Sequence, residues 1–306
     1  MEESRAVGAL VGSAVADALG APFEFGGPGQ YSERFSDPPP DGGSEMIGGG
    51  TFDWAPGEFT DDTQMAVHLA ESLVENGLAL DRDDLWLRWQ AWSENAADVG
   101  ITTRRALVFD NWRDVVHPDP ERTAANGALM RCTALALLDV PRDVRLRWTL
   151  EQAAMTHAHP DAGLGAWLGV AAMRAAIEGG DPFDVLHKEV ASLPSGSHER
   201  FAAVLGEDWH PIGSHPYNGG VWVCLATAVW AVRGAKTYEE AVVRAIDCGG
   251  DTDTVACVAG ALAGALHSID AIPARWRSDL HGSPDGERTI RADDLAVLAC
   301  RLAGYR

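Results

Sequence analysis

The chain has 306 residues, of which 46% are hydrophobic, so it can bury a sizeable core as one large domain or as two. Its formal net charge is -21 and its pI is about 4.7. Such a charge repels nucleic-acid phosphates and anionic lipid surfaces, which argues against general nucleic-acid or membrane binding. The negative charge does not exclude a small anionic ligand, provided that a cation or helix N-termini neutralise the ligand locally.

The cysteines and the N-terminal residues both indicate a cytoplasmic protein. An odd number of isolated cysteines in apolar surroundings predicts reduced, buried thiols. These cysteines are Cys132, Cys224, Cys248, Cys257 and Cys300. The apolar run of residues 7–16 follows an acidic start and is interrupted by Asp17, whereas a secretory signal would begin with basic residues. We expect no membrane-spanning segment.

Apolar residues recur at helical spacing along most of the chain, and the alternation typical of strands is scarce. This pattern predicts an all-α fold, a single compact orthogonal multi-helix domain of roughly a dozen helices over residues 1–306. The expected helices are residues 5–19, 60–76, 81–96, a segment after 98–104, a segment from 127, and residues 142–156, 163–178, 182–191, 221–232, 238–246, 255–267 and 292–302. The small residues of the first helix would let a neighbouring helix approach closely.

The end of the first expected helix carries an acid in apolar company. Pro22 stops the helix and leaves Glu24 just beyond it, between Phe23 and Phe25. Such a carboxylate is either a paired structural acid or an acid whose pKa is tuned for catalysis. Residues 26–59 follow with nine glycines and five prolines, which is typical of a functional or disordered loop. We treat this loop as a candidate flap over the site that the next helix begins.

That next helix begins with the motif Thr60-Asp61-Asp62. Thr60 is a good N-cap, and two acids in the first turn complement the exposed amides and the positive end of the helix dipole. Good capping would account for the motif by itself. Hydroxyl and carboxylate oxygens at this density are also the ligands that a hard divalent cation prefers.

A second acidic helix start repeats this theme nearly two hundred residues later. The segment Asp251-Thr252-Asp253-Thr254 follows a Gly-Gly turn and opens the helix at residues 255–267. If the two starts face each other, they offer an oxygen-only ligand set that suits one or two Mg²⁺ or Mn²⁺ ions and does not suit zinc. Converging acids without a cation would repel strongly, so convergence itself would imply a metal.

Two further segments carry weaker signals. The turn Asn126-Gly127 opens directly into an apolar helix, whose first amides could bind phosphate. His157 and His159 are separated by two positions and do not share a helix face, so a zinc pair is not expected.

Five segments of the chain, in this order, resemble the ADP-ribosylglycohydrolase family. They are residues 7–25, 56–65 (Pro-Gly-Glu-Phe-Thr-Asp-Asp-Thr-Gln-Met), 126–131 (Asn-Gly-Ala-Leu-Met-Arg), 156–157 (Thr-His) and 249–254 (Gly-Gly-Asp-Thr-Asp-Thr). The resemblance runs from about residue 5 to the last expected helix. Its two Asp/Thr motifs together are highly specific, whereas the Asn-Gly and Thr-His segments only support it.

The resemblance implies an all-α fold with a binuclear Mg²⁺ or Mn²⁺ centre at the bottom of a cleft. It also implies hydrolysis of the bond between C1″ of ADP-ribose and an acceptor. The partner would be an ADP-ribosylated protein, modified on arginine or serine, or a small molecule such as O-acetyl-ADP-ribose. By their place in the motifs, the metal ligands would be Thr60, Asp61, Asp62, Asp251, Asp253 and Thr254.

The same correspondence assigns the substrate contacts. Glu24 would reach the attacking water or the substrate, Asn126 and Gly127 would contact ADP-ribose, His157 would lie near the ribose, and Asp98 would help to orient the substrate. His159 has no counterpart.

The chemistry fits these roles. Cations that hold the ribose hydroxyls would fix C1″ beside an activated water. Cleavage develops oxocarbenium character, which nearby carboxylates stabilise while one of them accepts the proton of the water. The residues in question are Glu24, Asp62 and Asp251, and the sequence does not choose among them.

One segment departs from the family pattern. Members that act on ADP-ribosyl-arginine tend to carry a Gly-Tyr pair just before the helix that begins here near Val221, where this chain has Tyr217-Asn218-Gly219-Gly220. Arginine, serine and O-acetyl-ADP-ribose therefore stay open as acceptors, with Tyr217 or Trp222 as substitutes for the missing tyrosine. A non-catalytic ADP-ribose-binding or crystallin-like relative, and a metal-dependent phosphohydrolase of another fold, are the alternatives. The intact Asp/Thr motifs and Glu24 favour the hydrolase.

Overall fold

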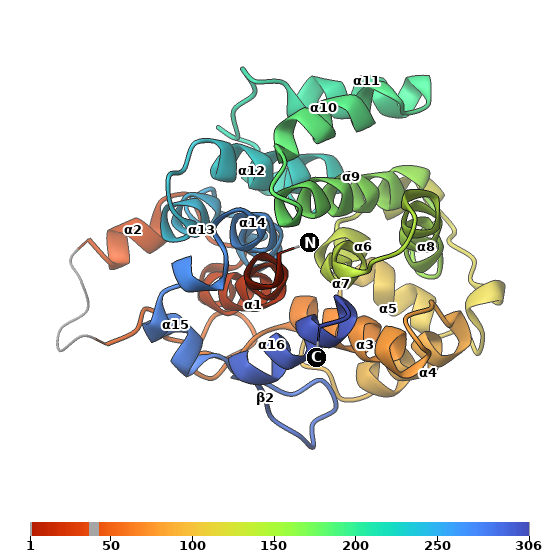
Figure 1. The fold of residues 1–306 in the computed structure, drawn as a ribbon, viewed down its shortest axis with the longest axis horizontal. Coiled ribbons are helices and arrows are strands. Elements are labelled where there is room, and N and C mark those ends of the chain that lie inside the picture. The colour runs from red at the N-terminus through yellow and green to blue at the C-terminus, as the bar shows by residue number, and fades with distance from the viewer. Residues whose placement is uncertain (1, 37–42, 306) are drawn as a thin grey trace.

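The computed structural model describes residues 2–36 and 43–305, and nearly all of the regular structure in them is helical (Figure 1). The α-helices are α1 (Glu3–Gly20), α2 (Gln30–Arg34), α3 (Asp61–Glu75), α4 (Arg82–Ser93), α5 (Ile101–Leu107), α6 (Gly127–Met130), α7 (Thr133–Leu137), α8 (Arg142–Ala154), α9 (Pro160–Ile177), α10 (Pro182–Ala191), α11 (Ser195–Leu205), α12 (Val221–Arg233), α13 (Tyr238–Ile246), α14 (Thr252–His267), α15 (Ala274–Asp279) and α16 (Ala292–Leu302). Two short strands, β1 (His281–Gly282) and β2 (Ile290–Arg291), pair antiparallel. The all-α prediction is confirmed.

Helices α1 and α14 form the centre of the fold and run antiparallel along each other, backbone against backbone. A Cβ atom on Gly8 would lie 2.4 Å from the carbonyl oxygen of Gly264, and one on Gly260 would lie 2.3 Å from the carbonyl oxygen of Gly12. Only glycine permits this approach, because any side chain would collide with the opposite backbone. The contact confirms that the small residues of the first helix admit a close neighbour. It also sets the C-terminal end of α1 beside the N-terminal end of α14.

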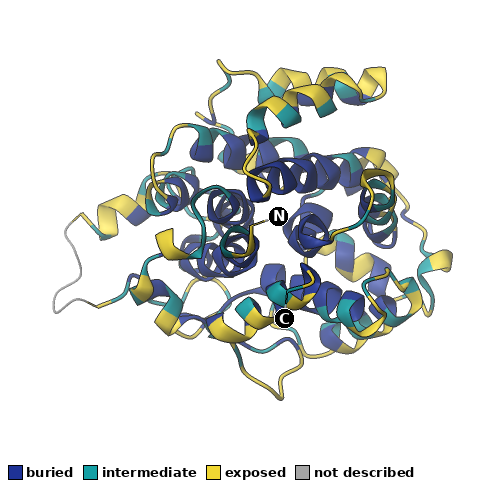
Figure 2. Ribbon diagram, in the orientation of Figure 1, coloured by how far each residue is buried: buried dark blue, intermediate teal, exposed yellow. Residues whose placement is uncertain are grey.

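The remaining long helices surround this pair. Helices α9, α12 and α13 pack on α14, and α3 and α16 pack on α1. Figure 2 shows the consequence: the central helices are buried along their length, whereas α10 and α11 at the edge are largely exposed. Leu10, Val15 and Leu19 of α1, with Val255 and Leu262 of α14, belong to the resulting core.

The central position of α1 explains its composition. Residues Glu3–Phe23 are long and apolar enough to cross a membrane by length and composition, which the sequence analysis did not expect. In the fold, however, 94% of that apolar window is buried inside the protein. The apolar character of α1 is accounted for by its packing against α14.

Helices α2, α11 and α15 lie where no helix was expected. Helix α11 occupies the first part of the polar stretch at residues 195–220, and α15 follows α14. Helix α11 buries only Ser197 and Phe201, which leaves too narrow an apolar face to recognise in the sequence. All five cysteines are free, and Cys132, Cys224 and Cys257 are buried, as predicted. Cys248 and Cys300 are only partly buried, so the prediction of burial was wrong for these two.

The predicted loop at residues 26–59 contains the short helix α2, and residues 37–42 of it lie outside the described part of the chain. Its first part is attached to the turn before α14, because Gly29 N–H donates to the carbonyl of Asp247 at 2.9 Å and Ser32 N–H donates to the carboxylate of Asp247 at 3.0 Å. Near its other end, Glu45 accepts hydrogen bonds from Arg275 and from the indole of Trp276. A flap role for this loop stays a prediction.

Candidate active site

The two acidic helix starts meet in the structure. Thr60 caps α3, since its Oγ1 accepts a hydrogen bond from the Asp62 amide at 3.3 Å. Asp251 is the residue before α14, and Thr254 lies in the first turn of that helix. Thr254 Oγ1 is 3.1 Å from each carboxylate oxygen of Asp62, which joins two helix starts separated by 192 residues. The two acidic helix starts therefore face each other, which the sequence spacing alone could not establish.

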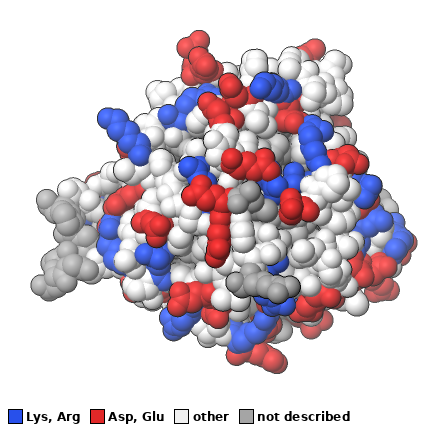
Figure 3. All heavy atoms as spheres, viewed as in Figure 1, with Lys and Arg blue, Asp and Glu red and all other residues white. Residues whose placement is uncertain are grey.

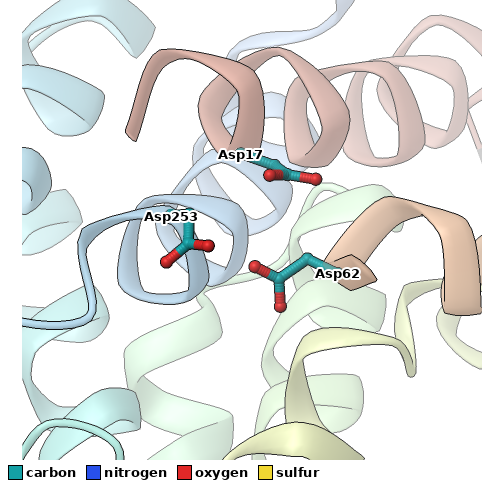
Figure 4. A group of neighbouring side chains, drawn as sticks. All are labelled: Asp17, Asp62 and Asp253. Carbon is teal, nitrogen blue, oxygen red and sulfur yellow. The ribbon is translucent and has the colours of Figure 1, made fainter. Parts of the chain in front are cut away.

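Where the two helix starts meet, carboxylates from them and from α1 and the segment after it form two overlapping groups. Asp17, Asp62 and Asp253 come from α1, α3 and α14, are all buried, and point toward a common space (Figure 4). Each offers an oxygen atom within 4.8 Å of the others. Glu24, Asp251 and Asp253 form the second group by the same distance. Asp253 belongs to both groups and is the link between them.

Asp17 was not among the predicted site residues, yet it is central to the geometry. Its carboxylate accepts hydrogen bonds from the Thr60 amide at 3.1 Å, the Thr63 amide at 3.1 Å and the Thr63 hydroxyl at 2.5 Å. It thus holds the first turn of α3 against α1. The signal for Asp17 in the sequence was its isolation, because it is fully buried and is the single charged residue in the apolar, buried stretch Ala6–Gly20.

Electrostatics within the cluster are unfavourable in the absence of a cation. Burial, followed by the Coulomb fields of neighbouring acids, raises the pKa of Asp61, Asp62 and Asp253 well above the ordinary value. Burial raises the pKa of Asp17 to about 6, although four hydrogen bonds from Thr60 and Thr63 oppose it. Within residues 2–36 and 43–305, no Arg, Lys or His forms an ion pair with these carboxylates.

Glu24 and Asp98 complete the acidic cluster. Burial, then the charges of Asp251, Asp98 and Asp17, raise the pKa of Glu24 to about 8. Burial, then Asp251, raise the pKa of Asp98 to about 6. The structure therefore places the predicted acids Glu24 and Asp98 close enough to the acids of both helix starts for their charges to interact.

Two buried oxygens in this cluster lack a hydrogen-bond partner. They are Glu24 Oε2 and Asp253 Oδ1. A buried carboxylate oxygen without a donor is costly unless a ligand or cation satisfies it. Oxygen donors alone, several of them charged and buried, fit Mg²⁺ or Mn²⁺ and do not fit zinc. The residues therefore fit the implied cations, although the identity and number of the ions stay a prediction.

Asn126 and Asn218 hold the turn that precedes α14. Asn126 Nδ2 donates to Asp251 Oδ2 at 2.9 Å and orients that carboxylate. Asn218 is buried, accepts from the Asp251 amide at 3.0 Å, and donates to the Gly249 carbonyl at 2.8 Å. Asn126 thus lies at the site, while its role as a substrate contact stays a prediction. From the sequence, Asn218 was named only within the segment that departs from the family pattern, because its partners are distant in sequence.

His157 and His159 have different environments. His157 is buried beside Gly127, where an added Cβ would lie 3.3 Å from His157 Nε2. That Nε2 atom has no partner. His159 instead caps α9, with Nδ1 accepting from the Asp161 amide at 3.0 Å, which explains a histidine without a counterpart in the family.

The segment where the chain departs from the family pattern presents one exposed aromatic residue. Tyr217 is 70% exposed. Trp222 is engaged elsewhere, since its indole Nε1 donates to Asp161 Oδ2 at 2.8 Å. Of the two aromatic residues considered as substitutes, Tyr217 is the one whose side chain is free of such a bond among the described residues.

Comparisons with known proteins point in one direction. The family model for ADP-ribosylglycohydrolase matches residues 1–306. The chain is 33% identical to ADP-ribosyl-(dinitrogen reductase) glycohydrolase from Rhodospirillum rubrum, over 96% of each chain. It is 32% identical to ADP-ribosylarginine hydrolase Tri1 from Pseudomonas putida, covering 89% of this chain and 73% of that one. A solved structure described as an ADP-ribosylglycohydrolase-related protein complex matches with a TM-score of 0.71 and 32% identity, over 99% of this chain and 98% of that one.

Proposed function

The chain belongs to the ADP-ribosylglycohydrolase family, and from that premise we propose that it is a metal-dependent hydrolase that releases ADP-ribose from an ADP-ribosylated acceptor. The observation that carries the proposal is the cluster of buried carboxylates at the meeting of α1, α3 and α14. Asp17, Asp62 and Asp253 are too close and too buried to be stable together as anions without a compensating charge.

In this proposal the cation ligands are Thr60, Asp61, Asp62, Asp251, Asp253 and Thr254. Bound Mg²⁺ or Mn²⁺ would supply the positive charge that offsets the carboxylates and polarises ribose and water oxygens. Asp17 and Asn126 orient the set, Asp17 by holding the first turn of α3 and Asn126 by its bond to Asp251. The protein thus supplies a preorganised oxygen cage.

Glu24 has the role of proton acceptor in this scheme. Its Oε2 atom has no partner within the described chain, so it is available to a water molecule or a substrate hydroxyl. Without cations, burial and three neighbouring acids raise the pKa of Glu24 to about 8; bound cations would lower this pKa, so in the loaded site Glu24 would be a carboxylate that can accept a proton at neutral pH. The other acids of the cluster stabilise the oxocarbenium charge that develops at C1″.

For the acceptor, we place ADP-ribosyl-arginine first. The Pseudomonas putida relative carries that substrate in its name. Exposed Tyr217 offers an aromatic face to a guanidinium in place of the missing Gly-Tyr pair. Serine-linked ADP-ribose and O-acetyl-ADP-ribose are the competing acceptors.

The test is to incubate the protein with ADP-ribosylated arginine peptide, ADP-ribosylated serine peptide and O-acetyl-ADP-ribose, each with Mg²⁺, with Mn²⁺ and with EDTA. We expect release of free ADP-ribose in the presence of metal and none in EDTA. No release from any of the three substrates with metal present would sink the hydrolase. Calorimetric binding of ADP-ribose without turnover would instead identify a binding module.

A further inference from the structure

A buried arginine lies behind His157 and has no carboxylate partner among residues 2–36 and 43–305. Arg131 is 0% exposed and follows α6. Its Nε donates to Gln152 Oε1 at 2.8 Å, and its Nη2 donates to the Gln152 carbonyl at 2.9 Å and to Thr156 Oγ1 at 2.8 Å. Its guanidinium carbon lies 4.1 Å from the centre of the Trp89 ring. Burial lowers the pKa of Arg131 to about 9, so it is cationic at pH 7.

The hydrogen-bond inventory then determines the direction of each bond. A guanidinium can only donate, so Thr156 Oγ1 accepts from Arg131. Thr156 is 0% exposed, and the only other partner of its hydroxyl among the described residues is His157 Nδ1, at 2.8 Å. The single hydroxyl proton of Thr156 therefore goes to Nδ1, since the alternative would leave a buried hydroxyl proton without an acceptor. Nδ1 is then the unprotonated nitrogen.

The charge of Arg131 also disfavours a cationic histidine. Burial, then the field of Arg131, then His117, lower the pKa of His157 well below the ordinary value. A neutral imidazole that accepts at Nδ1 carries its proton on Nε2. Nε2 is the atom without a partner, beside Gly127. The neighbouring Asn126 is the residue that orients Asp251.

We propose that Arg131 is a positioning residue that acts through Thr156 to fix His157 as the Nε2–H tautomer, so that the imidazole offers a hydrogen-bond donor to an acceptor oxygen of the bound substrate. This inference rests on the proposed function only for its substrate, because the tautomer is a property of the protein alone. His157 in this arrangement is a fixed donor and does not act as a base. Such a donor suits the oxygen-rich ribose and phosphate groups of ADP-ribose.

The direct test is the tautomer of His157 in the Mg²⁺-bound protein without substrate. The protein has ten histidines, so ¹⁵N-histidine labelling with a long-range ¹H–¹⁵N correlation spectrum gives a readable set, and loss of one pattern in His157→Gln assigns His157. We expect a protonated Nε2 and an unprotonated Nδ1. A wild-type His157 that is protonated on Nδ1, or on both nitrogens, overturns the proposal whether or not the protein hydrolyses ADP-ribose.

Three variants test the two residues behind the histidine. Thr156→Val removes the hydroxyl that donates to Nδ1, so the Nδ1–H tautomer of His157 should become populated. Thr156→Ser keeps the hydroxyl and should keep the wild-type tautomer. Arg131→Met frees the Gln152 carbonyl, which lies four residues before Thr156 and can accept the hydroxyl proton, so the Nδ1–H form appears. We expect kcat/KM to fall about tenfold in Thr156→Val and to be recovered in Thr156→Ser. An unchanged tautomer in Thr156→Val and Arg131→Met overturns the role of the two residues.

Failure of this inference and failure of the proposed function are distinguishable. A protein that hydrolyses ADP-ribosylated substrates with His157 in the Nδ1–H form contradicts only the tautomer inference. A protein that hydrolyses none of them, yet shows the Nε2–H form and its loss in Thr156→Val, contradicts only the proposed function.

Discussion

Two buried aspartates occupy the same position in two apolar helices, and they have opposite chemistry. Asp161 is the second residue of α9, and Asp253 is the second residue of α14. Asp161 accepts hydrogen bonds from Ser197 at 2.5 Å, Arg200 at 2.6 Å and Trp222 at 2.8 Å. Although burial opposes it, these donors lower the pKa of Asp161.

Asp253 has acids for neighbours where Asp161 has donors. Burial and the charges of Glu24, Asp62, Asp251 and Asp17 raise its pKa well above the ordinary value, and its Oδ1 has no partner. A buried acid that the protein itself satisfies is structural, whereas a buried acid that it leaves unsatisfied is prepared for a ligand. The position in the helix is the same in both cases. What distinguishes the two aspartates is whether hydrogen-bond donors or other acids surround the carboxylate.

The surface charge does not explain the difference. On the face that Figure 3 shows, Lys and Arg side chains are scattered among Asp and Glu. Asp253 is buried and forms no ion pair with any of the described residues, so the proposed charge compensation would come from a bound cation.

The largest expected effect follows from neutralising one of the two aspartates. Asp253→Asn keeps the shape of the side chain and removes the charge shared by both carboxylate groups, so we expect kcat/KM for ADP-ribose release to fall by about 10³-fold or more at saturating Mg²⁺. Asp161→Asn is the matched control and should keep activity within a few-fold below its melting temperature. Near wild-type turnover in Asp253→Asn would remove this residue from the cation site.

Forcing α14 away from α1 should destabilise the central helix pair that carries Asp17 and Asp253. A Cβ on Gly264 would lie 2.0 Å from the Gly8 carbonyl oxygen, so Gly264→Ala forces α1 and α14 apart. We expect the free energy of unfolding to fall by about 3 kcal/mol, measured by urea denaturation. Gly27→Ala is the control, because a Cβ there meets nothing within 4 Å. Equal stability of the two variants would contradict the close helix contact.

The two aspartates should also differ in the sign of their effect on stability. Asp161→Asn breaks charge-assisted hydrogen bonds, so the free energy of unfolding should decrease by about 2 kcal/mol. Asp253→Asn removes repulsion, so in EDTA the variant should be at least as stable as the wild-type protein. Urea titrations in EDTA at pH 7.5 measure the free energy of unfolding of both variants and of the wild-type protein. Destabilisation of similar size in both variants would show that Asp253 has an unrecognised structural partner.

The smallest effect is a pH dependence of the stabilisation by cations. The folded protein without cations holds the pKa of Asp17 at about 6 and that of Glu24 at about 8, above their unfolded values. Between about pH 4 and pH 8 this folded state therefore binds more protons than the unfolded state, and its stability falls as the pH rises.

Cations replace those protons, so the melting temperature in Mg²⁺ minus that in EDTA should grow from pH 5 to pH 8 by on the order of 5 °C. Ion pairs elsewhere affect both samples alike and cancel in this difference. A difference that shrinks as the pH rises would contradict the raised pKa values. Asp253→Asn should reduce the slope, whereas Asp161→Asn should not.

Helices with a broad apolar face were predictable from the sequence. Helices α10, α13 and α16 have the predicted bounds, and α3 begins immediately after its predicted cap, Thr60. Helix α11 was not predictable, because its packing depends on little more than Phe201. The local pattern of apolar residues was sufficient to predict a helix wherever that helix buries a whole face.

The site was predictable in part, for a related reason. The acids at the starts of α3 and α14 follow local rules for helix starts, so their sequence pattern marked them. The roles of Asp17, Asn218 and Arg131 depend on contacts with distant segments: Asp17 bonds to Thr63 across 46 residues and Asn218 to Asp251 across 33. No local pattern encodes such a partner. The cleft and the ligand roles stay predictions drawn from the family.

The antiparallel contact of α1 with α14 has a consequence for biosynthesis. Helix α1 is translated before its partner α14, and Thr252, whose hydroxyl donates to the Gly20 carbonyl, follows Gly20 by 232 residues. At ordinary translation rates that delay is roughly 10 to 50 s. During it, the face of α1 that packs on α14 has no native surface to cover it, although Asp17 can already pair with Thr60 and Thr63. We therefore expect this face of α1 to be exposed to aggregation until α14 has been made, and the cation site to form only after Asp251 and Asp253 have been made.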